Sequence, residues 1–132
     1  MADRRRAWRF GWRAETVCVL LLRLKGYGIL ARRFRSPAGE IDIVARRGRT
    51  LVFIEVKARA SHDAALYAIT GRQQARLARA AIAWIGAHPA QFAPQSGGSV
   101  RFDVMAVAPR RWPVHMVNAW QADAADLQRV GW

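Results

Sequence analysis

The order of apolar and polar residues predicts a chain that begins with a helix. In residues 14–25, apolar side chains recur at i, i+3, i+4 and i+7, a spacing typical of an amphipathic helix. Gly26 follows as a C-terminal stop. The apolar face of this predicted helix consists of Val17, Leu20, Leu21 and Leu24.

Extended segments and a second long helix are predicted after it. The predicted strands are residues 27–34, 40–45, 50–57, 100–107 and 114–119. Helical spacing returns at 72–85, with Trp84 on the apolar side, where it is expected in the core. Residues 87–99, with two prolines and Gly97-Gly98, predict a mobile loop, and Asp123 could cap a short final helix.

This order of elements predicts an α/β fold, a mixed β-sheet with helices on its faces. A length of 132 residues is typical of a single domain, here 1–132 with a basic N-terminal arm at 1–12. A hydrophobic share of 52% is enough to build a core. The run at 17–22 is too short for a membrane span or a signal peptide, so we expect a cytoplasmic protein without a membrane partner.

The charge balance changes the picture by indicating a polyanionic partner. The chain has 22 Lys+Arg against 9 Asp+Glu, a net charge of +13, and Lys25 and Lys57 are its only lysines. Arginine binds phosphate through two parallel hydrogen bonds and stacks on bases, although genomic composition explains a high arginine share equally well. The surplus of positive charge predicts nucleic acid, with DNA favoured over RNA.

The arginines fall into two candidate groups. Arg32, Arg33 and Arg35, together with Arg46, Arg47 and Arg49 at the predicted hairpin, form the denser patch, for which nucleic-acid contact is favoured. Arg72 and Arg76 recur at helical spacing, where the alternative is an ordinary solvated helix face.

The predicted hairpin also concentrates acids in an otherwise basic chain. Glu40, Asp42 and Glu55 are three of only nine acidic residues, and Lys57 follows two positions later. A connection with an even number of residues, such as 46–49, places Asp42 opposite Phe53 and diagonal to Glu55, with both carboxylates on one face. A connection with an odd number of residues would place them on opposite faces.

A carboxylate pair of this kind predicts a divalent metal site. Two carboxylates about 4 Å apart repel by about 4 kcal/mol at an effective dielectric constant of about 20. Mg²⁺ or Mn²⁺ would relieve the repulsion and keep positions for water and phosphate. Lys57 could then orient or deprotonate the attacking water, or stabilise charge on the phosphate. The alternative is that these acids pair with arginines and Lys57 lies on a solvated face.

Short motifs along nearly the whole chain resemble one bacterial family. They are Gly26-Tyr27 before Ile29-Leu30, Gly39-Glu40-Ile41-Asp42, residues 51–59 (LVFIEVKAR), Arg101-Phe102-Asp103-Val104 and Asn118-Ala119-Trp120. Together they resemble the YraN family of PD-(D/E)xK nuclease-like proteins, which is similar to archaeal Holliday-junction resolvases.

This resemblance implies a restriction-endonuclease-like fold and an endonuclease, dependent on Mg²⁺ or Mn²⁺, that hydrolyses phosphodiester bonds in branched DNA. The superfamily's catalytic Asp, Glu and Lys map onto Asp42, Glu55 and Lys57. Glu40, Glu15 and the carbonyl of Val56 are implied to complete the metal shell, and resolvase-like relatives imply a homodimer. Family members commonly carry Lys-Gln where this chain has Gln73-Gln74, which removes one cation from these supporting positions.

Other functions and residues complete the sequence picture. The rival functions are a non-catalytic nucleic-acid-binding module of the same fold and a protein that docks on an acidic partner or the ribosome. Cys18 is the only cysteine, which fits a reducing compartment. His62, His88 and His115 are expected at the surface or in loops, and Trp8 and Trp12 are candidates for base stacking.

Overall fold

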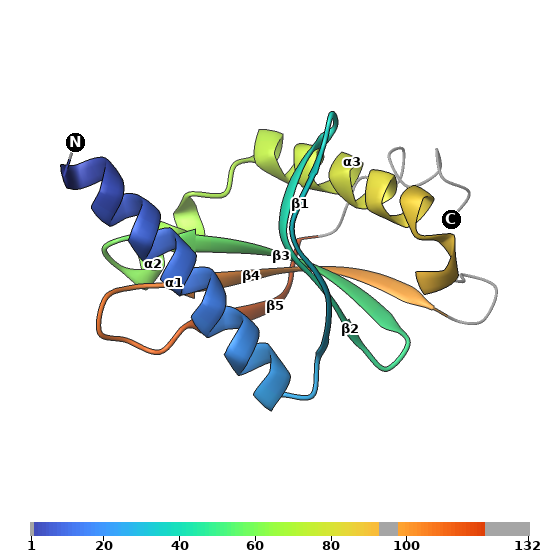
Figure 1. The fold of residues 1–132 in the computed structure, drawn as a ribbon, viewed down its shortest axis with the longest axis horizontal. Helices are drawn as coiled ribbons and strands as arrows, with labels where there is room; N and C mark the ends of the chain where they lie inside the picture. The colour runs from blue at the N-terminus through green and yellow to red at the C-terminus, as the bar shows by residue number, and fades with distance from the viewer. Residues whose placement is uncertain (1, 93–97, 121–132) are drawn as a thin grey trace.

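The computed structural model describes residues 2–92 and 98–120, with side chains from residue 13 onward (Figure 1). Its helices are α1 (Ala2–Leu24), α2 (His62–Tyr67), α3 (Gly71–Ala87) and the short 3-10 helix η1 (Pro89–Gln91). Its strands are β1 (Gly28–Ser36), β2 (Gly39–Arg47), β3 (Thr50–Ala58), β4 (Ser99–Val107) and β5 (Val114–Trp120).

All five predicted strands and both predicted long helices are present, with shifted ends. Helix α1 begins at Ala2 rather than at residue 14, and Gly26, at φ +90°, follows its end as predicted. The short helix α2 is not among the predicted elements; the Ser61 side chain caps it by accepting from Ala64 N. Residues 93–97 of the predicted mobile loop and the predicted final helix after Asp123 lie outside the described residues.

The strands form one mixed sheet in the order β1-β2-β3-β4-β5, which confirms the predicted α/β fold class and is consistent with a nuclease-like fold. Strands β1, β2 and β3 are an antiparallel meander, β4 runs parallel to β3, and β5 is antiparallel to β4. Helices α2 and α3 lie in the connection between the two parallel strands.

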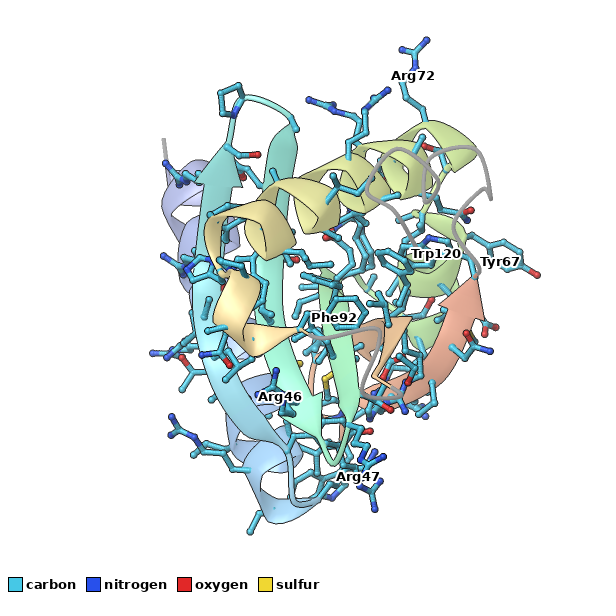
Figure 2. The ribbon with its side chains drawn as sticks, turned by 90° about the vertical axis from the view of Figure 1, so that its right-hand side faces the viewer. Arg46, Arg47, Tyr67, Arg72, Phe92 and Trp120 are labelled. Carbon is cyan, nitrogen blue, oxygen red and sulfur yellow. The ribbon has the colours of Figure 1, made fainter. Side chains whose placement is uncertain are left out.

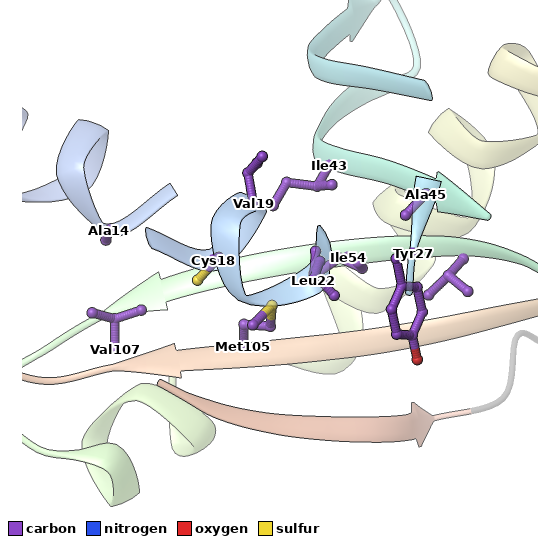
Figure 3. Close-up of a cluster of buried hydrophobic side chains, with 11 residues drawn as sticks. Ala14, Cys18, Val19, Leu22, Tyr27, Ile43, Ala45, Ile54, Met105 and Val107 are labelled. Carbon is purple, nitrogen blue, oxygen red and sulfur yellow. The ribbon is translucent and has the colours of Figure 1, made fainter. Parts of the chain in front are cut away.

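Helices cover the two faces of this sheet. In the view of Figure 2, α3 crosses in front of the strands and α1 lies behind them. One buried cluster joins α1 to the sheet through Cys18, Leu22, Ile43 and Met105 (Figure 3). The other cluster, on the α3 face, includes Trp84, whose predicted core position is confirmed. No helix in the described ranges is long and apolar enough to cross a bilayer.

Helix α1 packs through a different face from the apolar one that its spacing predicts. Leu22 is fully buried, with Ala14 and Cys18 beside it, whereas Leu20 is 54% exposed. Residues 14, 18 and 22 also follow helical spacing, and the small Ala14 and Cys18 side chains let the helix approach the sheet closely. The expected core face, Val17, Leu20 and Leu24, is therefore largely on the surface, and only Leu21 of that set packs against the core.

The β2–β3 hairpin fixes the position of the acidic residues. Arg47 pairs with Thr50, so the turn contains two residues, Gly48 and Arg49, instead of the predicted connection 46–49. The number is even, as the shared face requires. Because β2 continues two residues further than predicted, to Arg47, Phe53 pairs with Val44 and not with Asp42. The ladder ends with the pair Ile43 and Ile54, and Asp42 and Glu55 are the next residues along the two strands.

Candidate functional site

Asp42, Glu55 and Lys57 lie together where β2 and β3 run side by side. Val56 N donates to Asp42 Oδ2 at 2.8 Å, which anchors the carboxylate of β2 to the backbone of β3. The side chains of Asp42 and Glu55 are hydrogen-bonded to each other. Lys57 Nζ lies 3.4 Å from Glu55 Oε1. The sequence predicted these three residues on one face, and the structure brings them into contact.

The two carboxyl groups are partly removed from solvent, which disfavours the ionised form of each. Burial raises the pKa of Glu55 to about 8, and the negative charge of Asp42 adds to this effect. Burial also raises the pKa of Asp42, while its hydrogen bonds from Val56 N and Glu55 oppose the rise. Glu55, with a pKa of about 8, is the group of the two that favours its protonated form at neutral pH.

The start of α3 also contacts Lys57, through Gln73. Thr70 Oγ1 accepts from Gln73 N at 3.2 Å and caps the helix. With its amide oriented to satisfy both neighbours, Gln73 Oε1 accepts from Lys57 Nζ at 3.2 Å and its nitrogen donates to Ala68 O at 2.9 Å. Of the predicted supporting pair, Gln73 thus contacts the site, and Gln74 contributes its backbone N–H to Thr70 O.

A hollow of about 330 Å³ opens beside Glu55. Its wall is made by the β1–β2 turn, Glu55 and the first turns of α3; the lining residues are Ser36, Pro37, Gly39, Glu40, Glu55, Gln73, Arg76 and Leu77. Gly39, at φ +149°, lets α3 pack on the turn, because a Cβ atom there would lie 3.2 Å from Arg76 O. The predicted acid Glu40 lies in this wall, largely exposed, with Oε1 3.6 Å from Arg35 Nε.

Glu15, the acid predicted on the first helix, is held by two arginines. Its Oε1 lies 3.2 Å from Arg32 Nε and its Oε2 2.9 Å from Arg33 Nε. Arg33 has a φ of +54°, which turns two successive strand residues toward the same carboxylate. The charge of Glu15 contributes to the raised pKa of Asp42, so Glu15 acts on the pair electrostatically from within its own ion pairs.

The acids therefore do not assemble as one metal shell. In the described part of the chain, no three Asp, Glu, His or Cys side chains gather into a group able to hold a metal. Of the predicted set Asp42, Glu55, Glu40 and Glu15, the structure brings Asp42 and Glu55 together, and their binding of a metal stays a prediction. The carbonyl of Val56 as a ligand remains a prediction.

The other predicted nucleic-acid contacts are spread over the molecule. Arg46 Nη1 donates to Gln91 Oε1 at 3.1 Å, and the Arg47 guanidinium lies 5.4 Å from the centre of the Tyr27 ring. Arg72 projects from the start of α3, at the opposite end of Figure 2 from Arg47. The side chains of Trp8 and Trp12 lie outside those that the structure describes.

A polar cluster around Asp103 was not predicted as a site. Asp103 is fully buried and accepts from Arg101 Nε at 2.8 Å, His115 Nε2 at 2.7 Å and Asn118 N at 2.9 Å. Burial pushes its pKa up, but the hydrogen bonds outweigh burial and the net pKa lies below the ordinary value. An acid inside an apolar strand was the sequence signal for this cluster.

The expectation for the histidines is wrong for one of the three. The His115 side chain is 3% exposed, because it lies between Asp103 and Lys25, whose Nζ is 2.6 Å from His115 Nδ1. His88 is exposed as expected and ends α3, and His62 is half-buried at the start of α2.

The fold and site define a small α/β protein with a half-buried carboxyl pair and a buried lysine on adjacent antiparallel strands. Comparison with known proteins adds that residues 14–107 match Uncharacterised protein family UPF0102. The chain belongs to this family, which includes the YraN proteins.

Individual relatives match most of their own length. A UPF0102 protein of Parvibaculum lavamentivorans is 56% identical over 115 residues, which are 87% of this chain and 84% of that protein. One from Methylorubrum extorquens is 50% identical over 122 residues, 92% of each chain. A third, from Nitrobacter winogradskyi, is 52% identical over 116 residues, 88% of this chain and 95% of the relative.

Proposed function

We propose that this protein is a metal-dependent endonuclease of the PD-(D/E)xK type that hydrolyses phosphodiester bonds in nucleic acid, with branched DNA as the first candidate. The observation that carries the proposal is the contact between Asp42, Glu55 and Lys57. Two neighbouring, half-buried carboxyl groups, with a lysine 3.4 Å from one of them, match the residue types and order that the superfamily uses.

Asp42 and Glu55 are the residues that would hold Mg²⁺ or Mn²⁺. The fit rests on donor chemistry: both are oxygen ligands, and the electrostatic cost of ionising the two groups together is relieved by a doubly charged ion. When bound, such an ion supplies a Lewis acid for the phosphate and lowers the pKa of water. The backbone N–H of Val56 donates to Asp42 and holds its carboxyl group in place, so no further side chain is needed for this.

Lys57 prepares the attacking water in this proposal. Its ammonium group lies between Glu55 and Gln73, and its side chain is only 11% exposed, so its position is set before substrate arrives. A positioned ammonium orients the water, and it stabilises negative charge on the phosphate oxygens as one P–O bond breaks and another forms. Arg76, in the wall of the same hollow, would bind the phosphate.

The charge of the molecule supports a nucleic-acid substrate. A net charge of +13 steers polyanions toward the protein at moderate salt. Arg76 and Arg72 on α3 lie on the side of the sheet that carries the hollow beside Glu55. Phosphate contacts of this kind hold the backbone without reading its sequence, which suits recognition of branched structure.

Cleavage of branched, flapped and single-stranded DNA in Mn²⁺ tests the proposal. Asp42→Asn and Lys57→Gln are expected to lower the cleavage rate by at least about 100-fold, because each removes a group that acts in the transition state. Asp63→Asn, which removes an exposed acid on α2, is the matched control and should cut like the parent. Variants at Asp42 and Lys57 that cut as well as the control would exclude the assigned roles.

A second candidate function is a non-catalytic nucleic-acid-binding module. It is favoured by the ion pairs of Glu15 with Arg32 and Arg33, because arginines there neutralise an acid that the superfamily often uses at its metal. Thermal unfolding with and without Mn²⁺ separates the two functions. A metal that binds only the native state, at a concentration 100 times its Kd, raises the free energy of unfolding by about 2.7 kcal/mol. A binding module without a metal site is not stabilised by the metal.

A further inference from the structure

A second hollow, of about 300 Å³, lies at the other end of the β2–β3 hairpin. It is lined by the hairpin end and by the segment that follows α3; the lining residues are Arg46, Gly48, Arg49, Leu51, Ala90, Gln91, Phe92 and Gly98. Figure 2 shows Arg46 and Phe92 at this hollow, away from the start of α3 where Arg72 lies. Neither the carboxylate pair nor Lys57 takes part in it.

The second hollow lies on the same face of the sheet as Glu55. Arg46 pairs with Leu51, and Leu51 belongs to the buried cluster on the α3 face. Alternation along β3 places Phe53 and then Glu55 on that face as well. Glu55 is four residues from Leu51, so the hollow lies roughly 13 Å along the strand from the carboxylate pair.

The lining combines positive charge with an aromatic wall. Two arginines and no acid are among its described residues, so it attracts anions. One hydrogen bond from Arg46, to Gln91, uses one of the five donors of that guanidinium. Phe92 and Leu51 supply apolar surface beside the arginines. This combination suits a ligand that has a flat apolar ring and a phosphate.

The size and position of the hollow narrow the ligand further. About 300 Å³ is at the lower end of the volumes of small-molecule pockets, so it admits one nucleotide and excludes a base-paired duplex. Arg76 lines the first hollow and Arg79 lies one turn further along α3 toward the second, and both side chains are exposed. A strand held at the carboxylate pair would cross these arginines to reach Phe92.

We propose that the hollow of Arg46, Arg49 and Phe92 binds one unpaired nucleotide of the nucleic acid, with the phosphate at the arginines and the base against Phe92. This inference rests on the proposed function, because it assigns the unpaired part of that substrate to a place outside the cleavage site. It predicts a preference for flapped or branched DNA over blunt duplex.

Binding measured without metal tests this pocket separately from cleavage. Fluorescence anisotropy in EDTA compares a labelled single-stranded oligonucleotide, a flapped duplex and a blunt duplex. Arg49→Gln and Phe92→Leu are each expected to weaken binding of the first two by about fivefold or more, the effect of losing one base or phosphate contact. Arg23→Gln, an equal loss of charge at an exposed position of α1, should change it less than about twofold.

Further arms identify the ligand and its source. Phe92→Tyr keeps the ring and should bind like the parent. Thymidine 5′-monophosphate, thymidine and inorganic phosphate, used as competitors, show whether the pocket takes a free nucleotide, a base or an anion. A monophosphate that competes at Kd values below those of oligonucleotides would indicate a free nucleotide and overturn the assignment to a strand.

Two results would overturn the pocket. One is a Phe92→Leu variant that is folded by its thermal unfolding curve and binds flapped DNA like the parent. The other is an Arg49→Gln variant whose binding to blunt duplex is weakened as much as its binding to flapped DNA. Failure of the nuclease proposal would leave these binding results intact, since no metal or turnover enters them.

Discussion

The carboxyl group of Glu55 differs from an exposed glutamate because it keeps its proton near neutral pH. Asp42 is hydrogen-bonded to it, and Lys57 lies close enough to favour its ionised form without outweighing burial. When no cation is bound, the proton on Glu55 reduces the negative charge of the Asp42–Glu55 pair. In the proposed metal site, changes in pH and in metal concentration would therefore act on the same pair of groups.

The stability of the protein is expected to fall as pH rises from about 4.5 to about 8. The pKa of Glu55 is raised from 4.5 to about 8 in the folded state, so between these values the unfolded chain binds fewer protons than the folded one. Glu55→Gln removes this titration, and its free energy of unfolding should vary less over this window. Denaturant unfolding at pH 5 and pH 8 measures the difference, and parallel profiles of parent and variant would contradict it.

Asp103 gives a second prediction at the scale of single residues. Asp103→Asn leaves Arg101 and His115 facing a neutral side chain inside the protein, and we expect a loss of about 3 kcal/mol in the free energy of unfolding. Asp63→Asn, at an exposed position of α2, should change the free energy of unfolding by less than about 0.5 kcal/mol. Urea unfolding of the two variants decides, and equal losses would show that the buried cluster is not a stabilising unit.

The candidate site was predictable from sequence as far as local rules reach. Asp42, Glu55 and Lys57 follow from strand alternation and the parity of the turn, both of which are properties of neighbouring residues. The arginine partners of Glu15 were not, because the positive φ of Arg33 decides where that side chain points. His115 could not be placed without knowing that β5 pairs with β4, which brings it beside Met105 and near Asp103.

Helix α1 shows how far helical spacing alone predicts a fold. The sequence contains two stripes at helical spacing, and the stripe with larger apolar residues was the wrong one, because contact with the sheet favours the small residues Ala14 and Cys18. The strands were easier to predict from sequence, because an apolar run bounded by turn residues is compatible with few other structures. The β2–β3 turn is two residues shorter than predicted because β2 continues to Arg47, and this moves the partner of Phe53 from Asp42 to Val44.

A matched pair of substitutions tests which face of α1 is in the core. Leu22→Ala should cost about 3 kcal/mol in the free energy of unfolding, because Leu22 is fully buried against Ile43 and its neighbours. Leu20→Ala, at a position 54% exposed, should cost less than about 1 kcal/mol. Chemical denaturation measures both free energies of unfolding. A larger loss for Leu20→Ala than for Leu22→Ala would show that the predicted face, and not the observed one, is in the core.

The whole molecule carries a net charge of +13, and we expect the position of an arginine to affect DNA binding as well as its charge. If the α3 side faces the nucleic acid, Arg76→Gln should reduce the slope of log K against log salt by about one for duplex DNA, the loss of one phosphate contact. Arg23→Gln, on α1 at the other side of the sheet, should leave the slope unchanged. Titrations between 50 and 300 mM salt measure the two slopes, and equal reductions would indicate binding by net charge alone.

A crystal soaked in Mn²⁺ tests most directly whether Asp42 and Glu55 form a metal centre. The account predicts an anomalous scattering peak with oxygen atoms of both side chains at about 2.1 Å, and loss of the hydrogen bond between them. A crystal at saturating Mn²⁺ with no anomalous peak beside the two carboxyl groups would contradict it.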